Sequence, residues 1–228
     1  MLTYRRTLAA STLAVAALIT TACTPGSGSP GDGGGAGGRP AARGTALAAV
    51  DTLAVKGRAP KTGYEREKFG RAWVDVDGNG CGTRDDILKR DLTGVRFTDG
   101  HCKVASGTLT DDPYTGTTVR YVRGRSKVDI DHVVALSDAW QKGAQKWDGE
   151  TRRRFANDPL NLLAVDSAAN RGKSDGDAAT WLPANRAYRC TYVARQIAVK
   201  KKYGVWVTAG ERDAMKRVLG TCPQQKLP

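Results

Sequence analysis

The second half of the chain shows a regular succession of apolar stretches with strand-like and helix-like spacing. Residues 128–134 and 160–165 are short runs of mostly β-branched and aliphatic side chains, and each run predicts a strand. Apolar spacing and capping residues predict helices over residues 136–147, 150–156, a segment that Ser167 caps, residues 187–203 and a last stretch that ends at Leu219. This order of strands and helices predicts an α+β domain.

The preceding and following residues predict shorter elements. Short helices are expected at residues 46–55 and 84–92, with Thr83 as the cap of the second, and strands at residues 73–77, 104–109 and 117–122. Near the C-terminus, Thr208 and Glu211 have the spacing of a capping box. The lysines at residues 200–202 predict a solvated basic face that could also touch phosphate.

The N-terminal residues 1–23 have the pattern of a signal peptide. Arg5 and Arg6 precede an apolar run at residues 8–19 that is too short for a lasting membrane span. The run leads to Cys23 in a segment that resembles a bacterial lipobox, which predicts lipidation of this cysteine. Thr20 stands where such motifs usually have leucine, so simple secretion is the alternative.

Residues 24–44 are rich in Gly, Pro and Ser and predict a flexible tether before a domain at residues 45–228. The formal net charge is +13, and +11 remains without the two arginines of the signal peptide. Such a surplus favours a polyanionic partner, such as nucleic acid, anionic lipid or an acidic wall polymer, with solubility alone as the alternative.

Export predicts that the four cysteines of the domain form disulfides. Three pairings are possible, and the pairing Cys81–Cys102 with Cys190–Cys222 is favoured because it closes short loops. A four-cysteine zinc site is the rival, but no CxxC pair is present.

The segment DVDGNGCGTRDD at residues 75–86 fits the start of a calcium loop at Asp75, Asp77, Asn79 and Gly80, with Asp86 in place of the usual bidentate Glu. A turn held by the neighbouring cysteine explains the same residues. The two interpretations stay open.

The residue pattern of the central stretch suits phosphodiester hydrolysis, which needs a base for water, a cation and stabilisation of the leaving oxygen. His132 follows Asp131 at the end of a predicted strand, and an imidazole is a suitable base. Asn161 could hold the ring by accepting a proton from its other nitrogen. Asn170, on the predicted helix, could reach the same cation as Asp131. Lys173 is expected to contact phosphate or the leaving group, or else to form a surface ion pair.

The segments DHVVAL and ANRGKSD, with Asn161 between them, resemble an HNH nuclease of the ββα-metal (His-Me finger) type. More broadly, residues 64–222 resemble secreted actinobacterial HNH endonuclease proteins related to the C-terminal domain of GmrSD enzymes, through WVDVDGNGC, DPYTG, IDHVVALSDAW, FANDPLNLLAVD, DGDAATWLP and YVARQIAVK. The resemblance implies a ββα-metal core with additional helices and short strands. It also implies His132 as the base, Asp131 and Asn170 as metal ligands, and Asn161 as the residue that orients His132. Many HNH enzymes have histidine at the position of Asn170, so this residue favours Mg²⁺ (or Mn²⁺) over zinc.

The expected protein is therefore a monomeric extracellular endonuclease that cleaves DNA, with RNA as a second candidate substrate, and shows low sequence specificity. It would touch a membrane only through its N-terminal lipid anchor. The alternative function is a non-catalytic lipoprotein that binds nucleic acid or a cell-wall polymer on a nuclease-like fold.

Overall fold

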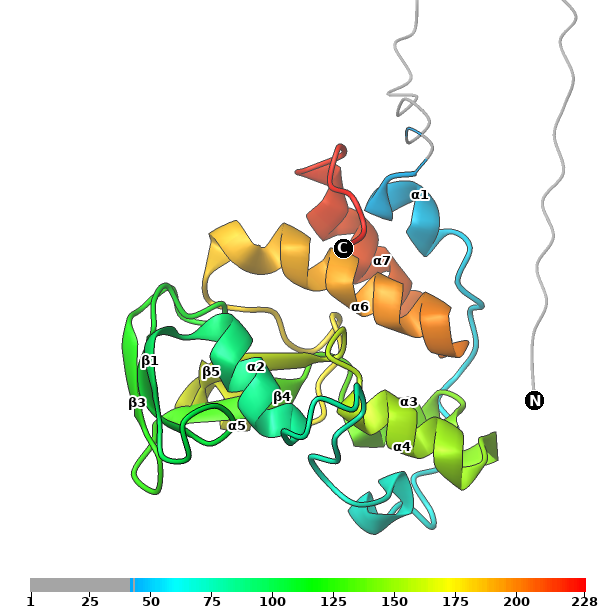
Figure 1. Cartoon of the computed structure of the whole chain (residues 1–228). Coiled ribbons are helices and arrows are strands. Elements are labelled where there is room, and N and C mark those ends of the chain that lie inside the picture. Colours follow the sequence, from blue (N-terminus) through cyan, green and yellow to red (C-terminus); the bar gives the residue numbers. More distant parts are fainter. Residues whose placement is uncertain (1–41, 43) are drawn as a thin grey trace, which may run out of the picture. The chain divides into compact units, whose positions relative to one another are not determined.

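Two separate antiparallel sheets form the strand part of the fold in the computed structural model, which describes residue 42 and residues 44–228. The first sheet contains β1 (Thr93–Phe97), β2 (Val104–Leu109) and β3 (Val119–Val122), in that order. The second pairs β4 (Val128–His132) with β5 (Leu162–Asp166). With the helices around them (Figure 1), the sheets confirm the predicted α+β class.

Seven α-helices and three short 3₁₀ helices are found among the described residues. The α-helices are α1 (Ala46–Val50), α2 (Thr83–Asp91), α3 (Leu136–Gln141), α4 (Gly149–Asn157), α5 (Ser167–Lys173), α6 (Arg189–Tyr203) and α7 (Ala209–Gly220). The 3₁₀ helices are η1 (Arg66–Phe69), η2 (Ala144–Lys146) and η3 (Arg186–Tyr188). The order β4, β5, α5 is the order expected of a ββα-metal core.

The pair β4–β5 lies at the centre of the fold and is buried on both faces. Val128 and Ile130 pack with side chains of α2 and of the three-stranded sheet. Leu163 and Val165 face the opposite way and pack with α1, α6 and α7. Strands covered on both faces have nearly continuous apolar runs, which is why this region of the sequence is so apolar.

The segment at residues 73–77, predicted as a strand, is an irregular loop. The carboxylate of Asp75 accepts hydrogen bonds of 2.8 Å from the backbone nitrogens of Gly78 and Gly80. Such local bonds compete with a strand ladder. The structure therefore has the turn that was one of the two interpretations of this segment, while calcium binding stays a prediction.

Helix boundaries differ from the predictions where a capping contact or a glycine decides them. Asp166 rather than Ser167 caps α5, because its carboxylate accepts from the backbone nitrogens of Ala168 and Ala169 at 2.9 Å. Thr83 lies inside α2, and its hydroxyl instead donates to the carbonyl of Val74. The predicted helix 136–147 is divided at Gly143, which has a φ of 130°.

The two predicted disulfides are present. Cys81 is joined to Cys102 with a Cα–Cα distance of 5.1 Å, and Cys190 to Cys222 with a distance of 6.5 Å. The first ties the loop before α2 to the connection between β1 and β2, and the second ties the start of α6 to the end of α7. The zinc alternative is thereby excluded for these four cysteines.

The signal peptide, Cys23 and almost all of the predicted tether lie outside the described residues. Among residue 42 and residues 44–228, no helix has the length and apolar character needed to cross a membrane.

A cluster of charged side chains joins α3, α6 and α7 inside the fold. Lys142 lies within 2.7 Å of three carboxylates, and Lys200 lies 2.9 Å from Glu211. The capping box predicted for α7 is therefore only half formed: Thr208 accepts from the nitrogen of Glu211, but the carboxylate of Glu211 is in this cluster. The members are Arg58, Asp138, Lys142, Asp177, Lys200 and Glu211, and their formal charges balance.

We expect Lys200→Met to lower the free energy of unfolding by about 3 kcal/mol, because it leaves buried carboxylates without one of their cations. Lys200 is fully buried, which corrects the expectation that residues 200–202 form a solvated face. Lys201, the next residue on the same helix, is exposed, so Lys201→Met is the matched control and should change stability by less than about 0.5 kcal/mol. Urea denaturation measures both; equal effects would contradict this role of Lys200.

Candidate active site

A polar cleft of about 350 Å³ lies where β4 ends. It brings together three of the five residues predicted for the site, namely Asp131, His132 and Asn170. Its other lining residues come from β4, from η1 and the segment before it, from the start of α3 and from the residues after α5; they are Lys61, Tyr64, Arg66, Ile130, Ala135, Leu136, Ser137, Ser174 and Asp175. The turn of β4 into α3 and the packing of α5 therefore bring residues that are separated along the chain into one cleft.

Asn161 holds the turn that ends β4. Its side-chain oxygen accepts from the backbone nitrogen of Val134 at 2.9 Å, and its Nδ2 donates to the carbonyl of Val134 at 3.3 Å. The Asn161 carbonyl also accepts from the nitrogen of Val133 at 2.8 Å. The predicted contact between the Asn161 amide and the imidazole is therefore wrong, because these backbone groups occupy the amide. Asn161 can orient His132 only through the backbone of Val133 and Val134, which follow His132 in the chain.

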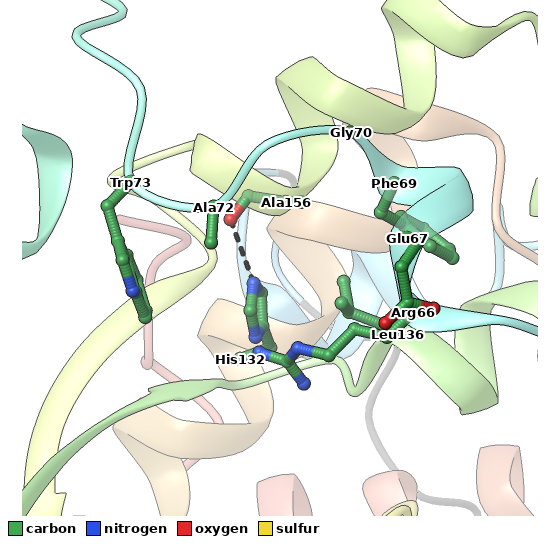
Figure 2. Close-up of a pocket in the computed structure, with 9 residues that line it drawn as sticks. All are labelled: Arg66, Glu67, Phe69, Gly70, Ala72, Trp73, His132, Leu136 and Ala156. Atoms are coloured by element: carbon green, nitrogen blue, oxygen red, sulfur yellow. Dashed lines mark hydrogen bonds between the residues drawn. The ribbon is translucent and has the colours of Figure 1, made fainter.

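The carbonyl of Ala156, at the end of α4, holds the imidazole of His132 at a distance of 2.8 Å from Nε2 (Figure 2). A carbonyl oxygen only accepts hydrogen bonds, so Nε2 donates and Nδ1 keeps the lone pair of the neutral ring. Burial lowers the pKa of His132 to about 3, and the positive charges of Arg66 and Lys173 act in the same direction. The ring is therefore neutral near pH 7, with a lone pair on Nδ1.

Asp131 and His132 leave β4 on opposite sides, as neighbouring strand residues do. The Asp131 carboxylate accepts from the hydroxyl of Tyr114 at 2.5 Å and lies 3.0 Å from Nζ of Lys173. Burial raises the pKa of Asp131, and Lys173 opposes this shift only in part. A carboxylate offers about four lone-pair directions, so two partners leave it capacity to bind a cation as well.

Lys173 does not line the cleft that holds His132. Its side chain is fully buried, and its ammonium contacts Asp131 and, at 2.8 Å, the carbonyl of His132. Both alternatives drawn from the sequence, a contact with phosphate and a surface ion pair, are corrected by this buried pair. Lys173 is placed to fix Asp131 and the end of β4 rather than to touch a substrate.

Asn170 offers the cleft a free amide oxygen. Its Nδ2 donates to Asp129 at 3.2 Å, which sets the orientation of the amide and leaves Oδ1 as the unpaired acceptor. Carboxylate and amide oxygens are the hard donors that Mg²⁺ prefers. The donor chemistry of Asp131 and Asn170 therefore fits the expected ion.

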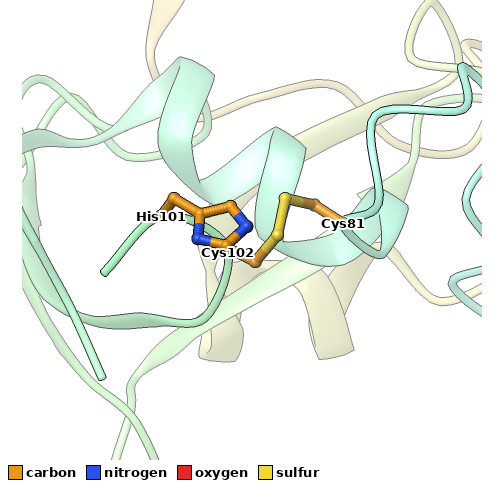
Figure 3. Close-up of side chains that lie close together, drawn as sticks. All are labelled: Cys81, His101 and Cys102. Atoms are coloured by element: carbon orange, nitrogen blue, oxygen red, sulfur yellow. A yellow bond between two sulfur atoms is a disulfide. The ribbon is translucent and has the colours of Figure 1, made fainter. Parts of the chain in front are cut away.

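A second group of possible ligands, Cys81, His101 and Cys102, lies in the loop beside α2 (Figure 3). The two sulfurs are joined to each other, so neither is available as a thiolate, which is the form that binds metal. With both sulfurs in a disulfide, these three residues do not form a metal site.

Several residues of the site were missed by sequence reasoning. Tyr114 belongs to the DPYTG segment and contacts Asp131, while Arg66 lines the cleft from η1. The contact from Ala156 is made by its backbone carbonyl, so the identity of residue 156 could not have predicted it. For Tyr114, the only hint was its place in a segment shared with the resembling family, without any indication of its partner.

Comparison with known proteins agrees with the resemblance. Residues 82–218 match the family model described as GmrSD restriction endonucleases, C-terminal domain. A curated relative from Arthroderma benhamiae, named an uncharacterized secreted protein, is 41% identical over 180 residues, which covers 78% of this chain and 85% of the relative. No solved structure shows a significant match. The matched range includes β4, β5, α5 and all five residues predicted for the site, and the chain belongs to the family of GmrSD restriction endonuclease C-terminal domains.

Proposed function

We propose that this protein is an extracellular, metal-dependent HNH-type endonuclease that hydrolyses phosphodiester bonds of DNA with low sequence specificity, with RNA as a second candidate substrate. The observation that carries the proposal is the cleft itself. Its walls include His132, whose imidazole is neutral with a free Nδ1, together with Asp131 and Asn170. Membership of a restriction endonuclease family supports nuclease chemistry in general.

In this proposal, His132 takes a proton from the attacking water through Nδ1, while the carbonyl of Ala156 keeps the ring in place. Asp131 and Asn170 would hold Mg²⁺ or Mn²⁺, which supplies neutralisation of charge on the phosphate. Lys173 and Tyr114 fix the carboxylate of Asp131 from behind. Arg66, at the edge of the cleft, contributes positive charge for a phosphate oxygen.

The charge of the chain supports a nucleic-acid substrate. The +13 balance favours contacts with phosphates, which carry no sequence information by themselves. The name of the Arthroderma relative supports export, and the two disulfides are typical of an oxidising compartment. Anchoring through a lipid on Cys23 and a monomeric state remain parts of the proposal.

A non-catalytic protein that binds nucleic acid or a wall polymer is the alternative function. It needs the basic charge but has no use for a neutral imidazole held beside two oxygen ligands. The two functions differ in a simple assay.

Incubation of residues 42–228 with supercoiled plasmid, single-stranded DNA and RNA tests the proposal. We expect cleavage with Mg²⁺ or Mn²⁺ and none with excess EDTA, and a rate that falls as salt rises because phosphate contacts are screened. Binding without cleavage of all three substrates, at every metal tested, would favour the alternative.

A further inference from the structure

A second hollow of about 210 Å³ also has His132 in its wall (Figure 2). Apolar groups form most of its wall, with Trp73 at one end and Phe69, Ala72 and Leu136 around it. Arg66, His132 and Leu136 line both this slot and the polar cleft. The slot therefore adjoins the cleft where a phosphate would be cut and shares His132 with it.

The dimensions of the slot suit one flat ring. A buried cavity of about 150 Å³ takes a benzene molecule, so 210 Å³ has room for a single nucleobase. The indole of Trp73 is nearly parallel to the imidazole of His132, with 18° between the planes and 6.4 Å between the centroids. Figure 2 shows Trp73 on one side of His132, and Arg66, Phe69 and Leu136 on the other.

Trp73 is held in place by its surroundings. The nitrogen of Val74 donates to the side chain of Asn157 at 3.2 Å, and the carbonyl of Val74 accepts from Thr83. The guanidinium of Arg84 lies 5.8 Å from the centroid of the indole. Trp73 also has a φ of 60°, which is rare for a bulky residue. Strained backbone of this kind persists where the surrounding structure imposes it, and it is concentrated at functional sites.

We propose that the slot lined by Trp73 and His132 binds one unstacked nucleobase of the substrate, next to the phosphate that is cut. This inference rests on the proposed nuclease function and names its preferred substrate: nucleic acid with unpaired nucleotides. Arg66 and Glu67 both line the slot, but only Arg66 also lines the polar cleft, where it carries the positive charge that a phosphate beside the bound base would meet. The face of an indole accepts any base, so the slot adds affinity without strong sequence preference.

A base in a duplex must leave its stack before it enters such a slot, and this step costs free energy. Single-stranded DNA, loops and mismatched positions avoid most of that cost. The protein should therefore cut single-stranded substrate faster than an intact duplex of the same sequence.

The test combines a change in the protein with a change in the substrate. Short single-stranded oligonucleotides that carry one abasic position, scanned along the sequence, keep every phosphate and remove one base. For the wild type, we expect cleavage at the phosphate beside the abasic position to fall by about 5- to 150-fold, the range for loss of one base–aromatic contact. Trp73→Leu should lose a similar factor on the intact oligonucleotide and nothing further on the abasic one.

Two further variants separate stacking from folding. Trp73→Gly removes the indole but also relieves the positive φ, so its backbone is better accommodated than that of Trp73→Leu. Trp206→Leu is the matched control, because Trp206 is half-buried elsewhere and its Nε1 donates to the carbonyl of Gly57. We expect Trp73→Gly to repeat the result of Trp73→Leu and Trp206→Leu to behave as the wild type.

Binding measured by fluorescence anisotropy in EDTA gives a readout that needs no cleavage. The intact oligonucleotide should bind the wild type more tightly than a fully abasic chain of equal charge, and both Trp73 variants should lose part of that difference. If the protein cuts nucleic acid but cleaves at intact and abasic positions equally well, the proposal of a base-binding slot is wrong and the nuclease function stands. If the protein cuts nothing but shows the Trp73-dependent difference in binding, the proposed nuclease function is wrong and the base-binding slot stands. Equal losses on intact and abasic substrates in the Trp73 variants would assign Trp73 a purely structural role.

Discussion

His132→Ala is expected to cut DNA on the order of 10²–10⁴ times more slowly than the wild type under single-turnover conditions, while metal and DNA still bind. This factor is the usual contribution of general-base catalysis. The reason lies in the geometry: the Ala156 carbonyl engages Nε2, so Nδ1 is the one nitrogen able to accept a proton from water. Asp131 and Asn170 remain in the variant, so the affinity for the metal should change little.

The other histidine supplies the control. His101 is exposed in a loop, and His101→Ala should retain the full cleavage rate. Thermal unfolding shows whether His132→Ala is folded. This control is needed because His132 is only 7% exposed, so its loss can also affect packing. If the folded His132→Ala protein cleaves at the wild-type rate, its histidine fills space and the proposed mechanism is wrong.

Asp131→Ala is expected to have two large effects that can be separated. As a proposed metal ligand, Asp131 should contribute at least about 10²-fold to metal-dependent cleavage, since charge stabilisation by a metal is worth several kcal/mol. As the partner of buried Lys173, it should also contribute about 3–5 kcal/mol to stability, because its removal leaves an uncompensated ammonium.

The double variant Asp131→Ala with Lys173→Met removes both charges, so it should recover most of the stability and none of the cleavage. Lys173→Met alone keeps Asp131 but removes the charge that opposes the rise of its pKa, so we expect cleavage to fall less than in Asp131→Ala and to fall together with the affinity for metal. Urea denaturation, titration calorimetry with Mn²⁺ and single-turnover cleavage measure the three properties. Loss of cleavage in Lys173→Met without loss of metal affinity would instead place Lys173 in contact with the substrate.

The sequence predicted the elements whose signals are local. The apolar runs of β4 and β5 stand out because both faces of this pair are buried. Residues 73–77 had a strand-like composition, but the Asp75 carboxylate bonds to the backbone of its own loop. The buried state of Lys200 could not be read from its position in a basic run, because its partners Asp138 and Glu211 are far away in the sequence.

In the candidate site, too, the sequence predicted what depends on local motifs and missed what depends on packing. The motif identified Asp131, His132 and Asn170, and the structure places all three in one cleft. It did not show that Asn161 acts on backbone, or that Lys173 is buried against Asp131, because these contacts depend on how α4 and α5 pack against β4. The slot beside His132 is lined largely by η1 and the segment that follows it to Trp73, which lie far from the motif in sequence.

The most direct measurement for the central claim is rescue of His132→Gly by imidazole. Removal of the side chain opens a space beside the slot, where free imidazole could replace the missing base. We expect that single-turnover cleavage of plasmid by His132→Gly rises with the concentration of neutral imidazole and then saturates, while the double variant of Asp131 and Lys173 gains nothing. A folded His132→Gly protein that cuts at the wild-type rate without imidazole, or equal acceleration of both variants, would contradict His132 as the general base.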